Sequence, residues 1–331
     1  MGAVSAGLQC SCFGTRKDLV TEHGSVLQPD WPKVDAETAT GTGSDSSDAS
    51  DENVSTDEAC RNDIEVESAT SVGMRKRASR RFNEDAVQIF QDGGRIAVVM
   101  CDGHGAEMAQ PTAQPSHVFA KTCMRHLLDR LARGEASPSA MLAAFKMSEA
   151  ELLASADVDT FCAGCTATLV LLTADRKTLH VLQAGDTQVA VDGKKGVDIT
   201  RAHRPSDPHE KERLISAGAK VKGNAIANSG VSYHVSRAIG DTMLNRHRAG
   251  EDASPGYDDK QKEISFYESL QLCGIVSEPE AYIFDVDGAS KVVIATDGVW
   301  DEIHTKDAVN VSAPDLVSGR ADDATAVTLV L

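Results

Sequence analysis

The sequence has little positive charge, no long apolar run and no internal repeat. Its 331 residues carry 33 Lys and Arg against 50 Asp and Glu, which gives a net charge of −17 at pH 7. Such an acidic chain is a poor candidate for nonspecific nucleic-acid binding, which needs a basic surface. No stretch reaches the ~18 consecutive apolar residues of a membrane-spanning helix. The N-terminal segment also lacks the apolar region of a signal peptide. We therefore expect a soluble protein of the cytoplasm or the nucleus.

Cysteine is present without a pattern that indicates disulfides. The eight cysteines are scattered, and only Cys162 and Cys165 have CxxC spacing. That spacing leaves open a redox or zinc site, but a structural zinc site needs a second pair of ligands, and no convincing pair follows. We favour the simpler interpretation, free thiols in a reducing compartment, some of which are buried as small apolar side chains.

Residues 1–70 differ in composition from the rest of the chain. The stretch from Asp35 to Glu67 is rich in Ser, Thr, Gly, Asp and Glu, and it offers too little apolar surface to offset the chain entropy lost on folding. We predict a disordered acidic tail over 1–70 and a folded domain over 71–331. Gly2, Cys10 and Cys12 leave open a membrane anchor by acylation, although Ala6 departs from the myristoylation pattern. Membrane association is expected only in that case.

Acidic residues stand beside several predicted strands. Two Val- and Ile-rich runs end on Asp102-Gly103 and on Asp297-Gly298, which is typical of buried strands closed by a turn. Glu84 and Asp85 precede another such run, and Asp322 precedes the last one. Carboxylates on the rigid ends of strands are suitable ligands for a hard divalent cation. These residues indicate a metalloenzyme whose site is assembled by the fold.

The order of the predicted elements favours an α+β fold with antiparallel sheets. Two strands come first, followed by two amphipathic helices and further strands, without a βαβ rhythm. The first helix carries core candidates over 118–131. The second is predicted to begin at Ser137-Pro138, an N-cap followed by proline, and to bury Met141, Phe145 and Leu152.

The motifs, taken in order, resemble the metal-dependent serine/threonine phosphatases of the protein phosphatase 2C family. The matching segments are Arg80–Asp85, Asp102–Gly105, Gly164–Ala167, Gly185–Thr187, His203–Pro205, Glu210–Gly218, Val235–Asp241, Glu278–Glu280, Ala295–Asp301 and Asp322–Thr325. The resemblance covers about residue 71 to the last residue. It implies two antiparallel β-sheets packed as a sandwich with helices on both outer faces, in four αββα layers. It also implies hydrolysis of phosphoserine and phosphothreonine in proteins at a site that holds two Mg²⁺ or Mn²⁺ ions.

The resemblance also assigns roles to single residues. Asp102 would bridge the two ions and the carbonyl of Gly103 would bind one of them, while Asp297 and Asp322 would hold the other. Glu84 and Asp85 would hold metal-bound waters. Arg80 would bind the substrate phosphate through its guanidinium group, and His104 would protonate the leaving alkoxide. Asp186 and Asp301 match positions of a third, weaker metal, and the alternative is that both are ordinary turn residues. The stretch from Gly223 to Tyr233 matches the flap beside the family's active site.

Three departures from the family pattern bear on activity. Ala202 replaces an acid before the His203 motif, and Asp323 replaces an asparagine. The span from Asp301 to Asp322 is shorter than the family usually has, which could misplace Asp322. The alternative function is therefore a weak or inactive phosphatase-like module for binding or scaffolding. The acids retained at every metal position favour an active phosphatase that acts on phosphorylated proteins. We expect the protein to be a monomer.

Overall fold

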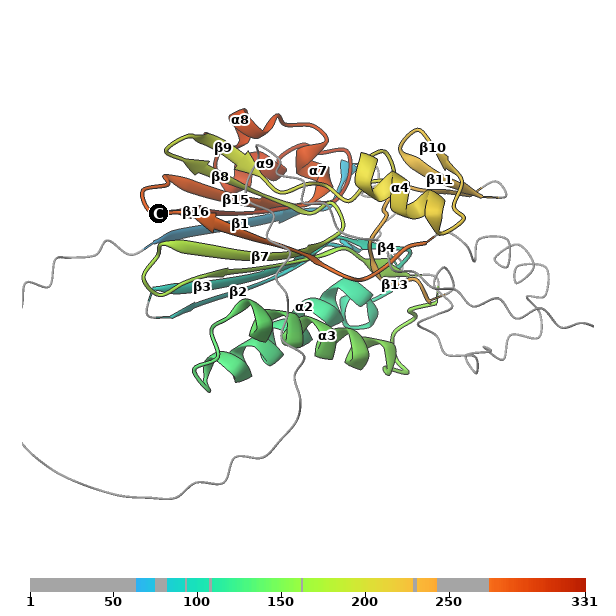
Figure 1. Ribbon diagram of the computed structural model, residues 1–331, viewed down its shortest axis with the longest axis horizontal. Coiled ribbons are helices and arrows are strands. Elements are labelled where there is room, and N and C mark those ends of the chain that lie inside the picture. The colour runs from blue at the N-terminus through green and yellow to red at the C-terminus, as the bar shows by residue number, and fades with distance from the viewer. Residues whose placement is uncertain are drawn as a thin grey trace, which may run out of the picture.

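The computed structural model describes residues 64–74, 82–92, 94–106, 109–161, 163–228, 231–242 and 274–331. Two five-stranded sheets face each other in it (Figure 1). The first sheet has the order β1 (Glu65–Ser71), β16 (Ala324–Val330), β15 (Lys291–Ala295), β8 (Gln188–Gly193) and β9 (Gly196–Ile199). The second has the order β14 (Glu280–Asp285), β7 (Thr178–Ala184), β6 (Ala167–Leu172), β3 (Arg95–Cys101) and β2 (Ala86–Asp92). Neighbouring strands within each sheet are antiparallel, so the predicted α+β sandwich is confirmed.

Helices cover the outer face of each sheet (Figure 1). The long pair α2 (Pro115–Leu131) and α3 (Pro138–Leu153) packs on the second sheet, after a short 3-10 turn η1 (Pro111–Ala113). Three short helices pack on the first sheet: α7 (Asp297–Trp300), α8 (Thr305–Ala308) and α9 (Ala313–Val317). The layers therefore follow the predicted order αββα. Within the described residues, no helix is both long enough and apolar enough to cross a membrane.

Two small sheets and one helix complete the described elements. The strands β4 (Gly103–His104), β5 (Gly164–Cys165) and β13 (Ile239–Gly240) form one small sheet. The other consists of β10 (Val221–Lys222), β11 (Ala225–Asn228) and β12 (Val231–Tyr233), next to α4 (Pro208–Ser216). Figure 1 places these elements at one end of the sandwich, while the C-terminus lies at the other end. The stretch from Gly223 to Tyr233, which was predicted as the flap, contains β11 and β12.

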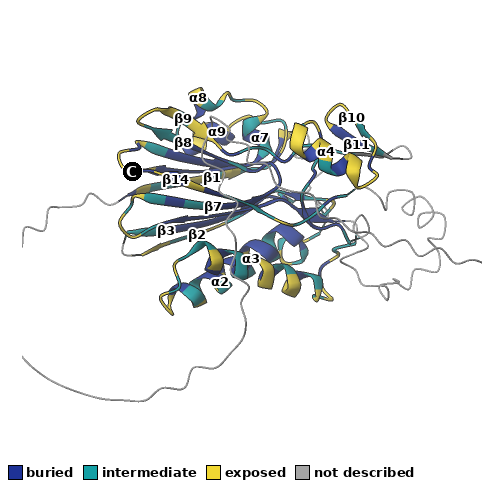
Figure 2. Ribbon diagram, viewed as in Figure 1, coloured by how far each residue is buried: buried dark blue, intermediate teal, exposed yellow. Residues whose placement is uncertain are grey.

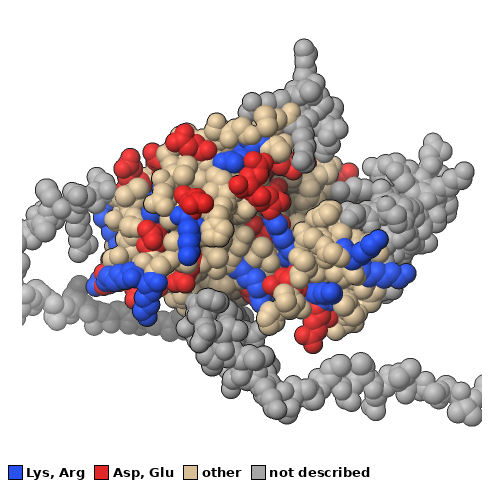
Figure 3. Space-filling view, turned by 90° about the horizontal axis from the view of Figure 1, so that it is seen from above, with Lys and Arg blue, Asp and Glu red and all other residues tan. Residues whose placement is uncertain are grey.

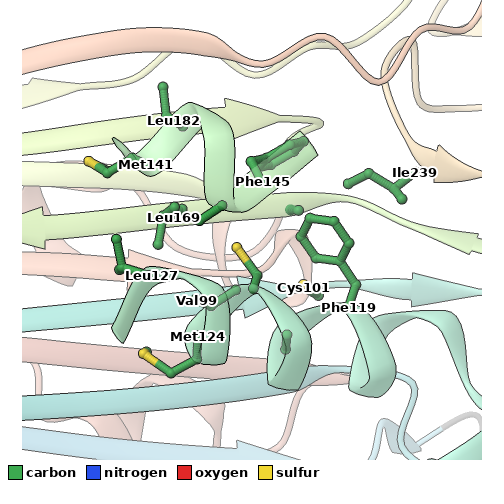
Figure 4. Close-up of a cluster of buried hydrophobic side chains, with 14 of the residues drawn as sticks. Val99, Cys101, Phe119, Met124, Leu127, Met141, Phe145, Leu169, Leu182 and Ile239 are labelled. Carbon is green, nitrogen blue, oxygen red and sulfur yellow. The ribbon is translucent and has the colours of Figure 1, made fainter. Parts of the chain in front are cut away.

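The interior is built from stacked apolar layers (Figure 2). Figure 4 shows the layer between the second sheet and the two long helices, where Phe119 and Phe145 meet edge to face with ring centroids 5.0 Å apart. The predicted helix start is confirmed, because the Ser137 hydroxyl accepts a hydrogen bond from the backbone N–H of Ala140 at 3.2 Å. Met141 is fully buried as predicted. This packing fixes the strands whose ends carry the acidic residues.

The strand β1 begins at Glu65, inside the segment that was predicted as an acidic tail. The strand pairs with β16 along its whole length, from Glu65 opposite Val330 to Ser71 opposite Ala324, and Ile64 just before it is buried. The alternating polar residues of β1 suit an edge strand with one face toward solvent, and in the sequence they resemble the acidic tail. Residues 1–63, including Gly2, Cys10 and Cys12, lie outside the described part of the chain.

Candidate active site

Asp102 and Asp297 meet at the ends of inner strands from the two sheets. Asp102 follows β3 and Asp297 begins α7 after β15, and their carboxyl groups lie close enough for each to shift the pKa of the other. Burial raises the pKa of Asp102 well above its usual range, and the negative charge of Asp297 raises it further. The pKa of Asp297 is also raised, chiefly by burial. Two carboxyl groups held this close share a proton unless a cation neutralises them.

Asp85 adds a third carboxyl group with an unsatisfied oxygen. One carboxylate oxygen accepts a hydrogen bond from the hydroxyl of Thr296 at 2.9 Å, whereas Oδ1 is buried and has no hydrogen-bond partner among the described residues. Burial raises the pKa of Asp85 to about 8, although the hydroxyls of Thr325 and Thr296 lower it, and the neighbouring carboxylates of Asp323 and Asp297 add to the rise. A buried, unpartnered oxygen beside two further carboxyl groups is suited to a cation or to the water that a cation holds.

The backbones of Glu84 and Gly103 pack tightly against each other beside these carboxyl groups. The carboxylate of Glu84 accepts a hydrogen bond from the backbone N–H of Ala106 at 2.7 Å, and its carbonyl accepts one from the hydroxyl of Ser116 at 2.5 Å. A Cβ atom at position 103 would lie 2.4 Å from that carbonyl oxygen, so only glycine fits there. Glycine is therefore required at position 103 by the close approach of the Glu84 backbone, whether or not its carbonyl binds a metal ion.

Asp322 returns to the cluster despite the short span that precedes it. Helices α8 and α9 occupy that span and pack on the first sheet, so the chain reaches β16 beside α7. The Asp322 side chain is exposed, and its negative charge is one cause of the raised pKa of Asp297. Its Oδ1 also accepts a hydrogen bond from the backbone N–H of Asp323 at 2.8 Å.

Asp323 has a structural role that the sequence did not reveal. Its buried carboxylate accepts hydrogen bonds from the backbone N–H groups of Gly73 and Glu84, both at 2.9 Å. It thus ties the segment after β1 to the segment before β2. A Cβ atom at position 298 would lie 2.0 Å from the Asp323 carbonyl oxygen, which explains the glycine after Asp297. The only sequence signal was an acid where the family has asparagine.

Asp186 and Asp301, the predicted ligands of a third metal, are both paired with Arg204. The arginine Nε donates to Asp186 Oδ2 at 2.9 Å, and its Nη2 lies 2.7 Å from Asp301 Oδ1. Nη2 is also 3.9 Å from Asp297 Oδ2. Burial raises the pKa of Asp186 to about 7, as does the charge of Asp297, whereas Arg204 lowers it. The sequence analysis did not single out Arg204 as part of the site.

His104 is held by two side chains from later segments of the chain. Its Nε2 lies 2.8 Å from Asp241 Oδ2 and 2.8 Å from the hydroxyl of Tyr233, which belongs to β12. Burial alone would lower the pKa of His104, but the charge and hydrogen bond of Asp241 outweigh it and raise this pKa above 6.5. Asp241 is buried and has a φ of +47°, which few non-glycine residues adopt. Neither Asp241 nor Tyr233 was predicted to contact His104.

The structure thus brings together all but one of the predicted site residues. Arg80 lies outside the described residues. In the described part of the chain, no three His, Cys, Asp or Glu side chains are already arranged as they would be around a bound metal ion. The donor set nevertheless fits a hard cation, because the carboxyl groups of Asp85, Asp102 and Asp297 have raised pKa values and one oxygen of Asp85 is unpartnered. On the face drawn in Figure 3, acidic and basic side chains are intermixed.

Known proteins resemble this chain over most of its described residues. The family model of protein phosphatase 2C matches residues 71–330. Among curated proteins, the chain is similar to probable protein phosphatase 2C 69 of Arabidopsis thaliana, at 27% identity over 72% of this chain and 60% of the relative. It is also similar to protein phosphatase 2C homolog 2 of Schizosaccharomyces pombe, at 26% identity over 60% and 47%. The chain therefore spans about half of the length of these relatives.

Solved structures support the fold. A phosphatase from Toxoplasma gondii matches with a TM-score of 0.56 and 15% identity, over 81% of this chain and 92% of that one. A serine-threonine phosphatase 2C from the same organism matches with a TM-score of 0.54 and 17% identity, over 81% and 94%. At these identities the likeness concerns the arrangement of the strands and helices.

Proposed function

The chain belongs to the protein phosphatase 2C family, and from this premise we propose that it hydrolyses phosphoserine and phosphothreonine in proteins with the help of Mg²⁺ or Mn²⁺. The observation that carries the proposal is the meeting of Asp85, Asp102 and Asp297 from three separate segments. Their raised pKa values mean that these carboxyl groups need a nearby cation to stay ionised at neutral pH. Such a cluster is costly to a fold and is typical of a functional site.

Two ions are proposed for this cluster. Asp102 and the carbonyl of Gly103 would bind one ion, Asp102 would also bind the second, and Asp297 and Asp322 would complete its ligands. Glu84 and Asp85 would hold the waters of hydration. Bound divalent cations supply the Lewis acidity that makes water nucleophilic at neutral pH and offsets the phosphoryl charge.

His104 is proposed as the general acid for the leaving oxygen. The carboxylate of Asp241, 2.8 Å from Nε2, favours the protonated imidazole, so a proton is available near neutral pH. The Tyr233 hydroxyl restrains the same ring from β12. Arg80, which precedes the cluster in the chain, is proposed to bind the substrate phosphate with its guanidinium group.

The alternative, an inactive module for binding or scaffolding, rested on the short span before Asp322. The packing of α8 and α9 argues against an inactive module. These two short helices return the chain to the neighbourhood of Asp297 although the span is shorter than the family usually has. In addition, each position at which the family has an acidic metal ligand holds Asp or Glu in this chain. Phosphorylated proteins remain the proposed substrates and a monomer the proposed state. A cytoplasmic or nuclear location, or an N-terminal membrane anchor, stays a prediction.

The test is turnover of p-nitrophenyl phosphate with Mn²⁺ by the whole chain and by Asp102→Ala and Asp297→Ala variants. We expect both substitutions to abolish metal-dependent turnover while circular dichroism shows an unchanged fold. The exposed Asp198 on β9 provides the control, because Asp198→Ala removes one carboxylate far from the cluster in the fold. Full activity in either site variant would reject the assignment. A folded wild-type chain that binds Mn²⁺ without turnover would favour the inactive module.

A further inference from the structure

Arg204 is anchored beside the acidic cluster by its neighbours in the chain. The backbone N–H of His203 donates to the Gly185 carbonyl at 3.1 Å, and the N–H of Gly185 donates to His203 Nδ1 at 3.2 Å. Two residues earlier in each segment, the side-chain amide of Gln183 donates to the Arg201 carbonyl at 2.7 Å. The His203 ring is completely buried, and its Nε2 lies 3.0 Å from Glu280. These contacts fix the backbone of Arg204 against the end of β7.

From this position the guanidinium group reaches three carboxylates at once. It lies 2.9 Å from Asp186, 2.7 Å from Asp301 and 3.9 Å from Asp297. Asp186 is almost fully buried, with 4% of its surface exposed, so its charge needs a partner within the protein. Among the described residues, Arg204 supplies the cation in every ion pair that Asp186 and Asp301 form. The two carboxylates that a third metal ion would use are thus the ones that Arg204 already contacts.

We propose that Arg204 serves as a built-in cation in place of a third metal ion, so that the active site takes up two divalent ions and no more. This inference rests on the proposed two-ion phosphatase site. A guanidinium group cannot be deprotonated under working conditions and is tethered to the chain, so it cannot dissociate as a weakly bound ion does. It also donates to both carboxylates, which holds Asp186 and Asp301 against the arginine.

The proposal makes a specific statement about metal stoichiometry. If Arg204 occupies the place of the third ion, removing its side chain frees Asp186 and Asp301 and creates a weak divalent site. Arg204→Lys keeps a cation at that place and should exclude the ion as the wild type does. Arg201 is the matched control, since it lies three residues earlier and pairs with Glu280 rather than with the cluster. Arg201→Ala removes the same charge without freeing Asp186.

The experiment counts bound Mn²⁺ per folded chain by equilibrium dialysis at millimolar free Mn²⁺. We expect two ions for the wild type, Arg204→Lys and Arg201→Ala, and three for Arg204→Ala. We expect two again for the double variant Arg204→Ala/Asp186→Asn, which would locate the extra ion at Asp186. Three ions in the wild type would overturn the inference, as would two in a folded Arg204→Ala chain.

Failure of the underlying assignment would look different. A folded wild-type chain that binds no Mn²⁺, or that keeps its ions after Asp102→Ala, would reject the two-ion site itself. If Arg204→Ala does not fold, the inference is tested by comparing the Mn²⁺ count of Asp186→Asn, in which Arg204 is kept, with that of the wild type. The inference predicts that this substitution leaves the count at two, whereas an ion held by Asp186 would be lost.

Discussion

The substitution Asp85→Asn should change how the stability of the metal-free protein depends on pH. Burial raises the pKa of Asp85 from 3.8 to about 8 in the folded chain. Between these values the folded state keeps a proton that the unfolded state has released. A group with a raised pKa therefore contributes stability that is present at low pH and is lost as the pH rises toward 8. The loss is about 1.4 kcal/mol per pH unit for one such group.

Asparagine cannot ionise, so Asp85→Asn should make the stability profile shallower. From about pH 5.5 to about pH 7.5, we expect the wild type to lose about 1–3 kcal/mol more than the variant. Any fixed cost of the new amide beside Thr296 is independent of pH and cancels in the slope. Asp198→Asn, at an exposed position of β9, should follow the wild type.

The assay is urea unfolding at a series of pH values with a chelator present, followed by circular dichroism. Added Mn²⁺ should flatten the wild-type profile, because a bound cation keeps the carboxylates ionised in the folded state. Equal slopes for Asp85→Asn and the wild type without metal would refute the reasoning. A steeper slope in the variant would refute it as well.

Three further predictions concern the proton donor, the first strand and the core. His104→Gln should lower the rate on a phosphoserine peptide by about 10²–10⁴-fold and far less on p-nitrophenyl phosphate, whose leaving group needs no proton; equal losses on both would exclude a general acid. A chain that begins at residue 64 should hydrolyse p-nitrophenyl phosphate at the full rate, whereas one that begins at residue 72 should unfold at lower urea because it lacks β1. An inactive but folded chain from residue 64 would place earlier residues in the site. Phe145→Ala should cost about 3–5 kcal/mol of unfolding free energy, because the ring is fully buried against Phe119; a loss below about 1 kcal/mol in urea unfolding would contradict this packing.

Local patterns in the sequence were sufficient for the elements that form the core. The strands before Asp102 and Asp297 are short apolar runs with turn glycines, and both are buried as predicted. The helix that begins after Ser137 was marked by its cap and by its apolar stripe. In these segments the local signal and the tertiary packing agree, so a single window of sequence carries the information.

Partners that meet across the fold could not be predicted in the same way. Asp241 is 137 residues from His104, and its contact depends on the pairing of β13 with β5 and of β5 with β4. The contact of Arg204 with Asp186 likewise depends on the hydrogen bonds that join residues 183–185 to residues 201–203. The strand β1 was missed because its polar residues resemble the tail, and only its pairing with β16 makes it a strand.

The most direct test of the central claim is phosphate release from a phosphothreonine peptide as Mn²⁺ is added to the whole chain. Our account predicts no release with chelator, release that rises and saturates as Mn²⁺ is added, and no release at any Mn²⁺ concentration in Asp297→Asn. Asp198→Asn should behave as the wild type. Release that continues at the same rate in the presence of chelator, or that survives Asp297→Asn, would contradict a metal-dependent phosphatase site at the ends of β3 and β15.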